Sequence, residues 1–309
     1  MSGAAVLAGY SADLLVGDPP RWHPVAGFGR VAIALEDAVY APTRGRGTVF
    51  ALALVGATTL SVELLARAAP REIVLAAVTW TALGGRSLRR EAERVAGSIE
   101  ANDLDAARHG LQALCGRDAA ELSESEVCRA VVESVAENTS DAVVGALLWG
   151  ALAGPAGVAA HRAANTLDAM VGHRSERYAE FGFPAAKLDD AMSWPAARLS
   201  VVLTALAAPI VGGSPRSVAR TVRRDGGAHP SPNAGRIEAA FAGALGLRLG
   251  GQLAYEGAVE QRPQLGEGAA PGTPDIHRAV RLSFAVGAAA AVGATAIAAL
   301  RGHRAGGSP

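Results

Sequence analysis

The sequence has little charge, few aromatic side chains and almost no cysteine. Of 309 residues, 19% are charged and 5% are aromatic, and basic and acidic residues balance at 29 each. A neutral chain poor in aromatics lacks the basic surface and the stacking platforms with which proteins bind nucleic acids. Its two cysteines, Cys115 and Cys128, exclude a disulfide framework or a cysteine zinc site. The 50% hydrophobic content excludes a disordered chain.

Long runs without any charged residue are the main feature that is present. The runs 142–160 and 282–300 approach the roughly 20 residues that a helix needs to cross a bilayer. We predict an all-α fold, a polytopic helical integral membrane protein that forms a single membrane-embedded domain over residues 1–309. A soluble, alanine-rich helical bundle is the alternative. The predicted spans lie near 47–62, 73–85, 142–160, 199–215 and 282–300, with a possible extra span or re-entrant helix at 3–17.

The polar segments between these runs predict sidedness. Residues 86–141 are predicted to be a soluble helical insert, with Asn102 and Asp103 as candidates for one helix start and a capping box from Ser123 to Glu126 at another. Residues 216–281 are interpreted as a loop region, and no strands are expected. Five crossings would place both segments on the side that is richer in arginine, which the positive-inside rule assigns to the cytoplasm.

The first polar motif follows the N-terminal apolar run. Asp18 before Pro19 is typical of a helix N-cap followed by proline at the first helical position. Asp13 lies inside the run itself, where a carboxylate costs about 2.5–3.5 kcal/mol on insertion scales. Such a residue usually faces a polar cavity, so Asp13 is a candidate for function.

The second motif is a row of acids directly before the run 142–160. Glu133, Glu137 and Asp141 have the spacing i, i+4, i+8, which places them on one helix face. Stacked carboxylates repel each other unless a cation lies between them, and oxygen ligands without histidine or cysteine suit Mg²⁺. A solvated helix end, with Asp141 as a cap, is the alternative.

The third motif follows the same run. Arg162, Asn165 and Asp168 lie on one helical stripe, where basic and amide groups suit a phosphate or a carboxylate. Before them, Gly154-Pro155-Ala156-Gly157 predicts a helix break. The segment 142–174 either crosses the membrane with a kink or dips in and returns, which would bring the second and third motifs to one side. A fourth motif, from Asp225 to Gly235, predicts a tight loop.

Taken together, these motifs resemble the CobD/CbiB family of cobalamin biosynthesis, the adenosylcobinamide-phosphate synthases. Two departures from the expected pattern are Arg236-Ile237, where Trp-Pro is expected, and Lys187, where arginine is expected. The matching stretches are LLVGDPPRWHPV (14–25), ESVAENTSDAVV (133–144), HRAANTLDAMVGHRSERY (161–178), KLDDAMSWPAARLS (187–200) and HPSPNAGRIEAAFAGALGLRLGGQLAYEG (229–257).

The resemblance implies a ligase of the cell membrane whose active site faces the cytoplasm. Members join (R)-1-aminopropan-2-ol phosphate, or aminopropanol, to a propionate of adenosylcobyric acid, consuming ATP with Mg²⁺. No bound structural metal is expected, and the implied partners are corrinoid substrates, the lipid bilayer and other membrane enzymes of the corrinoid pathway. The chain has neither a P-loop nor a G-x-G-x-x-G fingerprint, so ATP binding depends on the resemblance alone. A non-catalytic scaffold and a transporter of the corrinoid pathway are the alternatives.

Each polar motif supplies residues for this reaction. Glu137, Asp141 and Asp168 are the catalytic candidates, with Asp168 as the base for the attacking ammonium. The metal candidates are Asp13, Asp18, Glu133, Glu137 and Asp141. The substrate-binding candidates are Arg162, Asn165, Thr166, Arg174, Lys187, His229 and Asn233.

Overall fold

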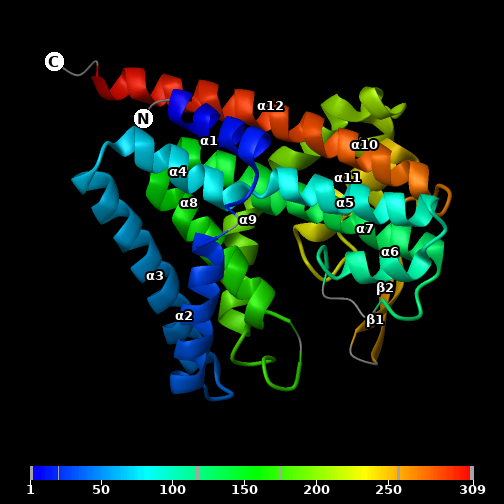
Figure 1. Ribbon diagram of the computed structural model, residues 1–309, viewed down its shortest axis with the longest axis horizontal. Coiled ribbons are helices and arrows are strands. Elements are labelled where there is room, and N and C mark those ends of the chain that lie inside the picture. The colour runs from blue at the N-terminus through cyan, green and yellow to red at the C-terminus, as the bar shows by residue number, and fades with distance from the viewer. Residues whose placement is uncertain (1–2, 20, 116–118, 174, 256–257, 307–309) are drawn as a thin grey trace. The chain divides into compact units, whose positions relative to one another are not determined.

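The described residues fold into helices and one short antiparallel pair of strands (Figure 1). The computed structural model describes residues 3–19, 21–115, 119–173, 175–255 and 258–306. In chain order the elements are α1 (Gly3–Val16), α2 (Pro24–Val39), α3 (Arg44–Ala68), α4 (Arg71–Leu83), α5 (Gly85–Glu100), α6 (Leu104–Leu111), α7 (Glu124–Asn138), the π-helix η1 (Thr139–Val144), α8 (Gly145–Val171), α9 (Phe183–Ala207), the 3₁₀-helix η2 (Ala208–Val211), α10 (Pro215–Asp225), α11 (Ala234–Leu245), β1 (Leu249–Tyr255), β2 (Ala258–Leu265) and α12 (Thr273–Gly306).

The chain divides into two compact units. Unit 1 comprises residues 1–84, 141–196 and 290–309, and unit 2 comprises residues 85–140 and 197–289. Each unit is therefore assembled from segments that are distant in sequence.

Four helical segments in the described part of the chain are long and apolar enough to cross a membrane, which confirms the predicted fold class. They are Arg44–Ala68, Glu124–Val171, Phe183–Val211 and Thr273–Arg301. The run 73–85 instead forms the 13-residue helix α4, about 20 Å long against a bilayer core of about 30 Å. The N-terminal run forms α1, which is also short.

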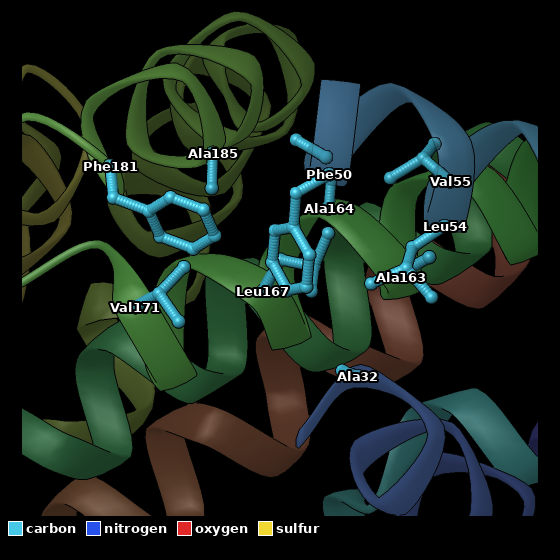
Figure 2. Close-up of a cluster of buried hydrophobic side chains, with 11 residues drawn as sticks. Ala32, Phe50, Leu54, Val55, Ala163, Ala164, Leu167, Val171, Phe181 and Ala185 are labelled. Atoms are coloured by element: carbon cyan, nitrogen blue, oxygen red, sulfur yellow. The ribbon is translucent and has the colours of Figure 1, made fainter. Parts of the chain in front are cut away.

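The helix α3 has one side that packs against the rest of unit 1 and an apolar side that is exposed. Phe50 and Leu54 are buried in the core of unit 1, where Phe50 lies 5.0 Å from the Phe181 ring, centroid to centroid (Figure 2). Val49 and Leu52 point outward and are 64% and 60% exposed. Exposed aliphatic side chains along a 25-residue apolar helix are what contact with lipid requires.

We therefore predict that the protein fractionates with membranes and needs detergent for extraction. The four long apolar helices motivate this expectation. Cell fractionation followed by size-exclusion chromatography, with and without detergent, measures it. Recovery of a monodisperse protein without detergent would contradict it.

The chain reverses direction inside α8. Gly154 has φ 68° and ψ −153°, which are not helical values. On a straight helix Gly145 and His161 would lie about 24 Å apart. Instead, a Cβ added to Gly145 would overlap the His161 ring, and one added to Gly150 would lie 3.2 Å from Val158 Cγ2. The helix α8 is therefore a helical hairpin with its corner at Gly154.

Of the two arrangements expected for this segment, the structure has the one that turns back. Pro155 has no amide to continue the first arm, and Gly154 supplies a backbone conformation that is essentially restricted to glycine. In the apolar window of Glu124–Val171, 78% of the residues are buried in protein. Burial of this kind is what permits broken backbone at membrane depth.

Three sequence predictions about local structure are wrong. Asp18 is not an N-cap: α2 begins at Pro24, and its cap is His23, whose Nδ1 accepts a hydrogen bond from the Val25 amide at 3.2 Å. The region 216–281 is not a loop, because it holds α10, α11, a β-hairpin and the start of α12. The antiparallel pair of β1 and β2 also contradicts the absence of strands. Glycines at the bulged start of β1 hide the alternation that marks a strand.

The predicted caps of the polar insert are confirmed. The Asp103 carboxylate accepts a hydrogen bond from the Ala106 amide at 2.9 Å. Ser123 and Glu126 form the capping box at the start of α7. Within unit 2, the amphipathic helix α5 buries its apolar face against α6 and α7.

Candidate functional site

A row of polar side chains joins the second arm of α8 to α9 within unit 1. Arg162 Nη1 donates to Asn165 Oδ1 at 3.4 Å, and Asn165 Nδ2 donates to Asp189 Oδ1 at 3.4 Å. Ser193 Oγ donates to the same Asp189 oxygen at 3.1 Å and lies 3.4 Å from His161 Nε2. Asp189, Ser193 and His161 are buried. The row connects a guanidinium to a buried imidazole through one carboxylate.

Two further carboxylates act on this guanidinium. Asp18 and Asp141 both interact electrostatically with Arg162. Three buried polar atoms nearby lack a hydrogen-bond partner: Asp18 Oδ1, Arg162 Nε and His161 Nδ1. Buried polar atoms are rarely left unpaired, and such orphans are typical of a place where a ligand, an ion or water binds.

The loop that carries Asp18 is fixed by α1 and α4. The Gly17 amide donates to the Asp13 carbonyl at 2.9 Å, and Trp80 Nε1 donates to the Gly17 carbonyl at 2.8 Å. Gly17 has φ 76°, a conformation that favours glycine. Asp13 is fully buried, as its position in an apolar run predicts. His23 Nε2 lies 3.9 Å from Asp18 Oδ1.

The acidic row does not continue regularly into α8. The π-helix η1 contains Asp141, and a π-helix replaces the i→i+4 repeat by i→i+5, so the regular spacing from Glu133 through Glu137 ends there. Glu133 is buried, and its Oε1 accepts a hydrogen bond from the Gly250 amide at 2.7 Å within unit 2. Glu137 is half-buried. In the described part of the chain, no group of three or more histidine, cysteine or acidic side chains is arranged to hold a metal.

Unit 2 has a second polar cluster, which contains His229 and Asn233. Both side chains are buried. His229 Nδ1 accepts a hydrogen bond from the Ser231 amide at 3.0 Å, and its Nε2 lies 3.0 Å from Arg262 Nη1. The Asn233 carbonyl oxygen accepts a hydrogen bond from Arg198 Nη1. The tight loop predicted here is confirmed, and it directs an imidazole and an amide toward two arginines.

The remaining predicted residues outside unit 2 take part in neither polar cluster or lie outside the described residues. Lys187 is exposed and forms a salt bridge with Asp190 at 2.7 Å. Thr166 Oγ1 donates to the Arg162 carbonyl at 2.7 Å, which fixes its hydroxyl to the helix backbone. Asp168 is half-buried and packs against Gly172. Arg174 lies outside the described residues.

The segment after α8 is held to α2 by a buried carboxylate. Glu36 is 5% exposed, and its Oε1 accepts hydrogen bonds from Arg177 Nη2 at 2.8 Å and from the Tyr178 hydroxyl at 2.9 Å. Hydrogen bonding to Glu36 raises the pKa of Arg177. The pKa of Tyr178 is also raised, mainly by burial of its hydroxyl and secondly by its hydrogen bond to Glu36. These bonds fix where the chain leaves α8.

The sequence interpretation missed Asp189, Ser193 and His161. The available signal was helical spacing, since side chains four residues apart lie on the same face of a helix. Asp189 and Ser193 are spaced i, i+4 in the polar segment between the predicted spans 142–160 and 199–215, and so are His161 and Asn165. Their proximity depends on the pairing of α8 with α9, which the spacing does not encode.

Comparison with known proteins identifies the family. The family model described as CobD/Cbib protein matches residues 6–283. The cobalamin biosynthesis protein CobD of Mycobacterium tuberculosis H37Rv is 50% identical over 290 residues, which cover 93% of each chain. The chain belongs to the CobD/CbiB family. The CobD proteins of Chromobacterium violaceum and Rhodobacter capsulatus are 43% and 37% identical, over 87% and 90% of this chain and 88% and 92% of their own.

The CobD/CbiB match includes every residue of both polar clusters, from Asp18 in unit 1 to Arg262 in unit 2. No solved structure matches the chain.

Proposed function

We propose that the chain is an adenosylcobinamide-phosphate synthase of cobalamin biosynthesis. In this reaction ATP drives formation of an amide between (R)-1-aminopropan-2-ol phosphate, or aminopropanol, and a propionate carboxylate of adenosylcobyric acid. Membership in the CobD/CbiB family and the relatives named as cobalamin biosynthesis proteins support this assignment. We place the protein in the cell membrane, with its active site open to the cytoplasm.

The observation that carries the proposal is the arrangement around Arg162. A guanidinium that interacts with two carboxylates, Asp18 and Asp141, stands in a helical unit that is otherwise largely apolar. Phosphoryl transfer to a carboxylate builds negative charge on the phosphoryl oxygens, and fixed positive groups stabilise that charge. Arg162 is the group that we assign to this task, and Asn165 orients it through their hydrogen bond.

The proposed chemistry has two steps. A propionate oxygen of the corrinoid attacks the γ-phosphorus of ATP, the bond to the bridging oxygen breaks, and ADP leaves with that electron pair. The amine then attacks the acyl carbon, phosphate leaves, and the amine loses one proton to a base. Asp168, half-buried on α8, is the base that we assign. Asp189 holds Asn165 and Ser193 in place and is a positioning residue.

Two carboxylates near Arg162, those of Asp18 and Asp141, suit a magnesium ion that substrate phosphates also hold. Mg²⁺ is commonly held by one or two carboxylates together with substrate phosphates and water, so a cluster of three acids is not required. Asp18 has a buried oxygen without a partner and is the first candidate, with Asp141 second. When bound, the ion would offset charge on the nucleotide phosphates. Asp13, Glu133 and Glu137 remain predicted ligands.

The proposal is tested with purified protein in detergent. It is supplied with ATP, Mg²⁺, adenosylcobyric acid and either aminopropanol phosphate or aminopropanol, and the amide product is sought by mass spectrometry. Product that depends on ATP supports the proposal, and the preferred amine identifies the substrate. Specific binding of adenosylcobyric acid without turnover would instead favour the scaffold or the transporter.

The helical hairpin predicts the sidedness of its two ends. A single crossing would place residue 121, before α7, and residue 175, after α8, on opposite sides of the membrane. A re-entrant hairpin places them on the same side, which we expect to be the cytoplasm. Glu121→Cys and Ser175→Cys, each in a background without Cys115 and Cys128, are labelled with an impermeant maleimide in intact and opened cells. Labelling of Ser175→Cys alone in intact cells would contradict the expectation.

A further inference from the structure

The helix α10 presents a basic face that the proposed reaction does not use. Arg216, Arg220 and Arg223 have the spacing i, i+4, i+7, which places them on one side of the helix. All three are exposed. With Ala219 and Arg224 they line an open depression of about 440 Å³.

Packing on α11 fixes the direction of this face. The opposite side of α10 carries Val218 and Thr221, which are buried. A Cβ added to Gly243 of α11 would lie 2.9 Å from Val218 Cα and 2.9 Å from Thr221 Oγ1, so the two helix backbones are in close contact. The arginines consequently point away from the body of unit 2.

The neighbouring acids pair with Arg224 and offset only part of the charge of this face, since Arg220 also interacts electrostatically with Glu267. Arg224, at the end of the helix, is paired with Asp225 and Glu267, and its hydrogen bonds hold the pKa of both carboxyl groups below the usual range. In the parts of the chain that the structure describes, no carboxylate forms a salt bridge with Arg216, Arg220 or Arg223. The four arginines of the face outnumber the two acids beside them, so the face keeps a net positive charge toward an anionic partner.

The face lies directly after a segment that can span a membrane. The segment Phe183–Val211 is followed by three residues and then by α10. The Gly213 amide donates to the Ala208 carbonyl at 3.0 Å, and a Cβ on Gly213 would overlap the Ala244 carbonyl, so the link is held close to α11. Arg216 is the fifth residue after Val211, within about 18 Å of the end of the span even for an extended chain.

We propose that this face of α10 binds the headgroups of anionic phospholipids. A row of arginines on an open helix surface, beside a span, matches the charge of a lipid layer and is drawn to it. A soluble phosphate requires hydrogen-bond donors that surround it. This depression is open and its lining residues all come from α10, so it does not enclose a phosphate. Lipid binding there would fix the end of the α9 segment, and with it unit 2, at the membrane surface.

The test uses the full-length protein in mild detergent and native mass spectrometry. Phosphatidylglycerol and phosphatidylcholine are titrated separately, and their apparent affinities give the preference for anionic lipid. Each arginine near an anionic surface contributes roughly fivefold, so Arg216→Gln/Arg220→Gln/Arg223→Gln is expected to reduce the preference at least about tenfold. An unchanged preference in this variant overturns the proposal.

The matched control removes the same charge elsewhere. Arg44, Arg67 and Arg94 each form a salt bridge with a glutamate, so their triple replacement by glutamine is expected to leave the preference intact. An equal loss in this control would show a general effect of net charge and would overturn the proposal. Replacing the three α10 arginines by lysine is expected to retain most of the preference.

Two further measurements, at high salt and with competing ATP or inorganic phosphate, test lipid binding independently of the proposed synthase reaction. If the glutamine variant does not fold, the wild-type preference is measured at about 0.5 M salt, where screening should abolish it; a preference that persists contradicts a headgroup site. ATP and inorganic phosphate are added as competitors. Displacement of the lipid by ATP at substrate concentrations would identify a nucleotide site instead, and no displacement supports the lipid.

Discussion

Replacing Asp141 by asparagine is expected to lower amide formation by about 100-fold or more while the protein stays folded. Asp141 lies in the π-helical turn that leads into α8 and interacts electrostatically with Arg162. Loss of one preorganised charged group at a reacting centre typically costs 10²- to 10³-fold in rate. Turnover is measured at saturating ATP and Mg²⁺, together with the melting temperature in detergent.

Asp37→Asn is the matched control for this change. Asp37 is exposed on α2 in unit 1, so the same aspartate-to-asparagine change is made there away from the site. We expect near-wild-type turnover for this variant. Glu137→Gln is measured in parallel, because it was predicted from the same acidic row. If Asp141→Asn keeps full activity at saturating Mg²⁺, Asp141 is neither a metal ligand nor a required partner of Arg162.

Gly154→Ala is expected to destabilise the protein, because it forces a side chain onto the corner of the α8 hairpin. With φ 68° and ψ −153°, Gly154 occupies a backbone region essentially restricted to glycine, and occupying it with another residue costs on the order of 1–3 kcal/mol. Gly145→Ala tests the same hairpin at its open end, since the new methyl group would overlap the His161 ring. Thermal unfolding in detergent and the yield of folded protein measure both variants.

Gly56→Ala is the control for the two glycine variants. Gly56 lies in the middle of α3 with no atom within 4 Å of an added Cβ, so alanine is expected to be neutral or slightly stabilising there. Full stability of Gly145→Ala would mean that Gly145 and His161 are not in contact. The segment would then be a kinked crossing helix and not a hairpin.

The helices of this protein follow from short-range sequence features. Charge-free runs predicted α3 and α12, and the segments of α8 and α9, because an apolar run of this length satisfies its backbone in lipid only as a helix. Asp103 and Ser123 marked helix starts because their side chains bond amides only three residues away. The break at Gly154 was predicted because proline removes a backbone donor locally.

The composition of the sites, by contrast, was only partly predictable. Arg162 and Asn165 were found because they share one helix stripe. Their connection to Asp189 was not, because Asp189 lies 24 residues after Asn165 on another helix, and the register of α9 against α8 depends on packing. His229 was identified by the motif, but its neighbour Arg262 comes from β2, in a region interpreted as a loop.

By itself, the sequence determined that this chain is a helical membrane protein, which segments are apolar, where several helices start and break, and which family its motifs resemble. The tertiary structure alone decided that α8 turns back on itself, that α4 is too short to span a bilayer, and that Asp189 joins Asn165 to Ser193. The reason is physical. Propensity, capping and hydrophobic length act over a few residues along the chain, whereas the direction of a chain after a glycine and the register between two helices are set by packing between distant segments.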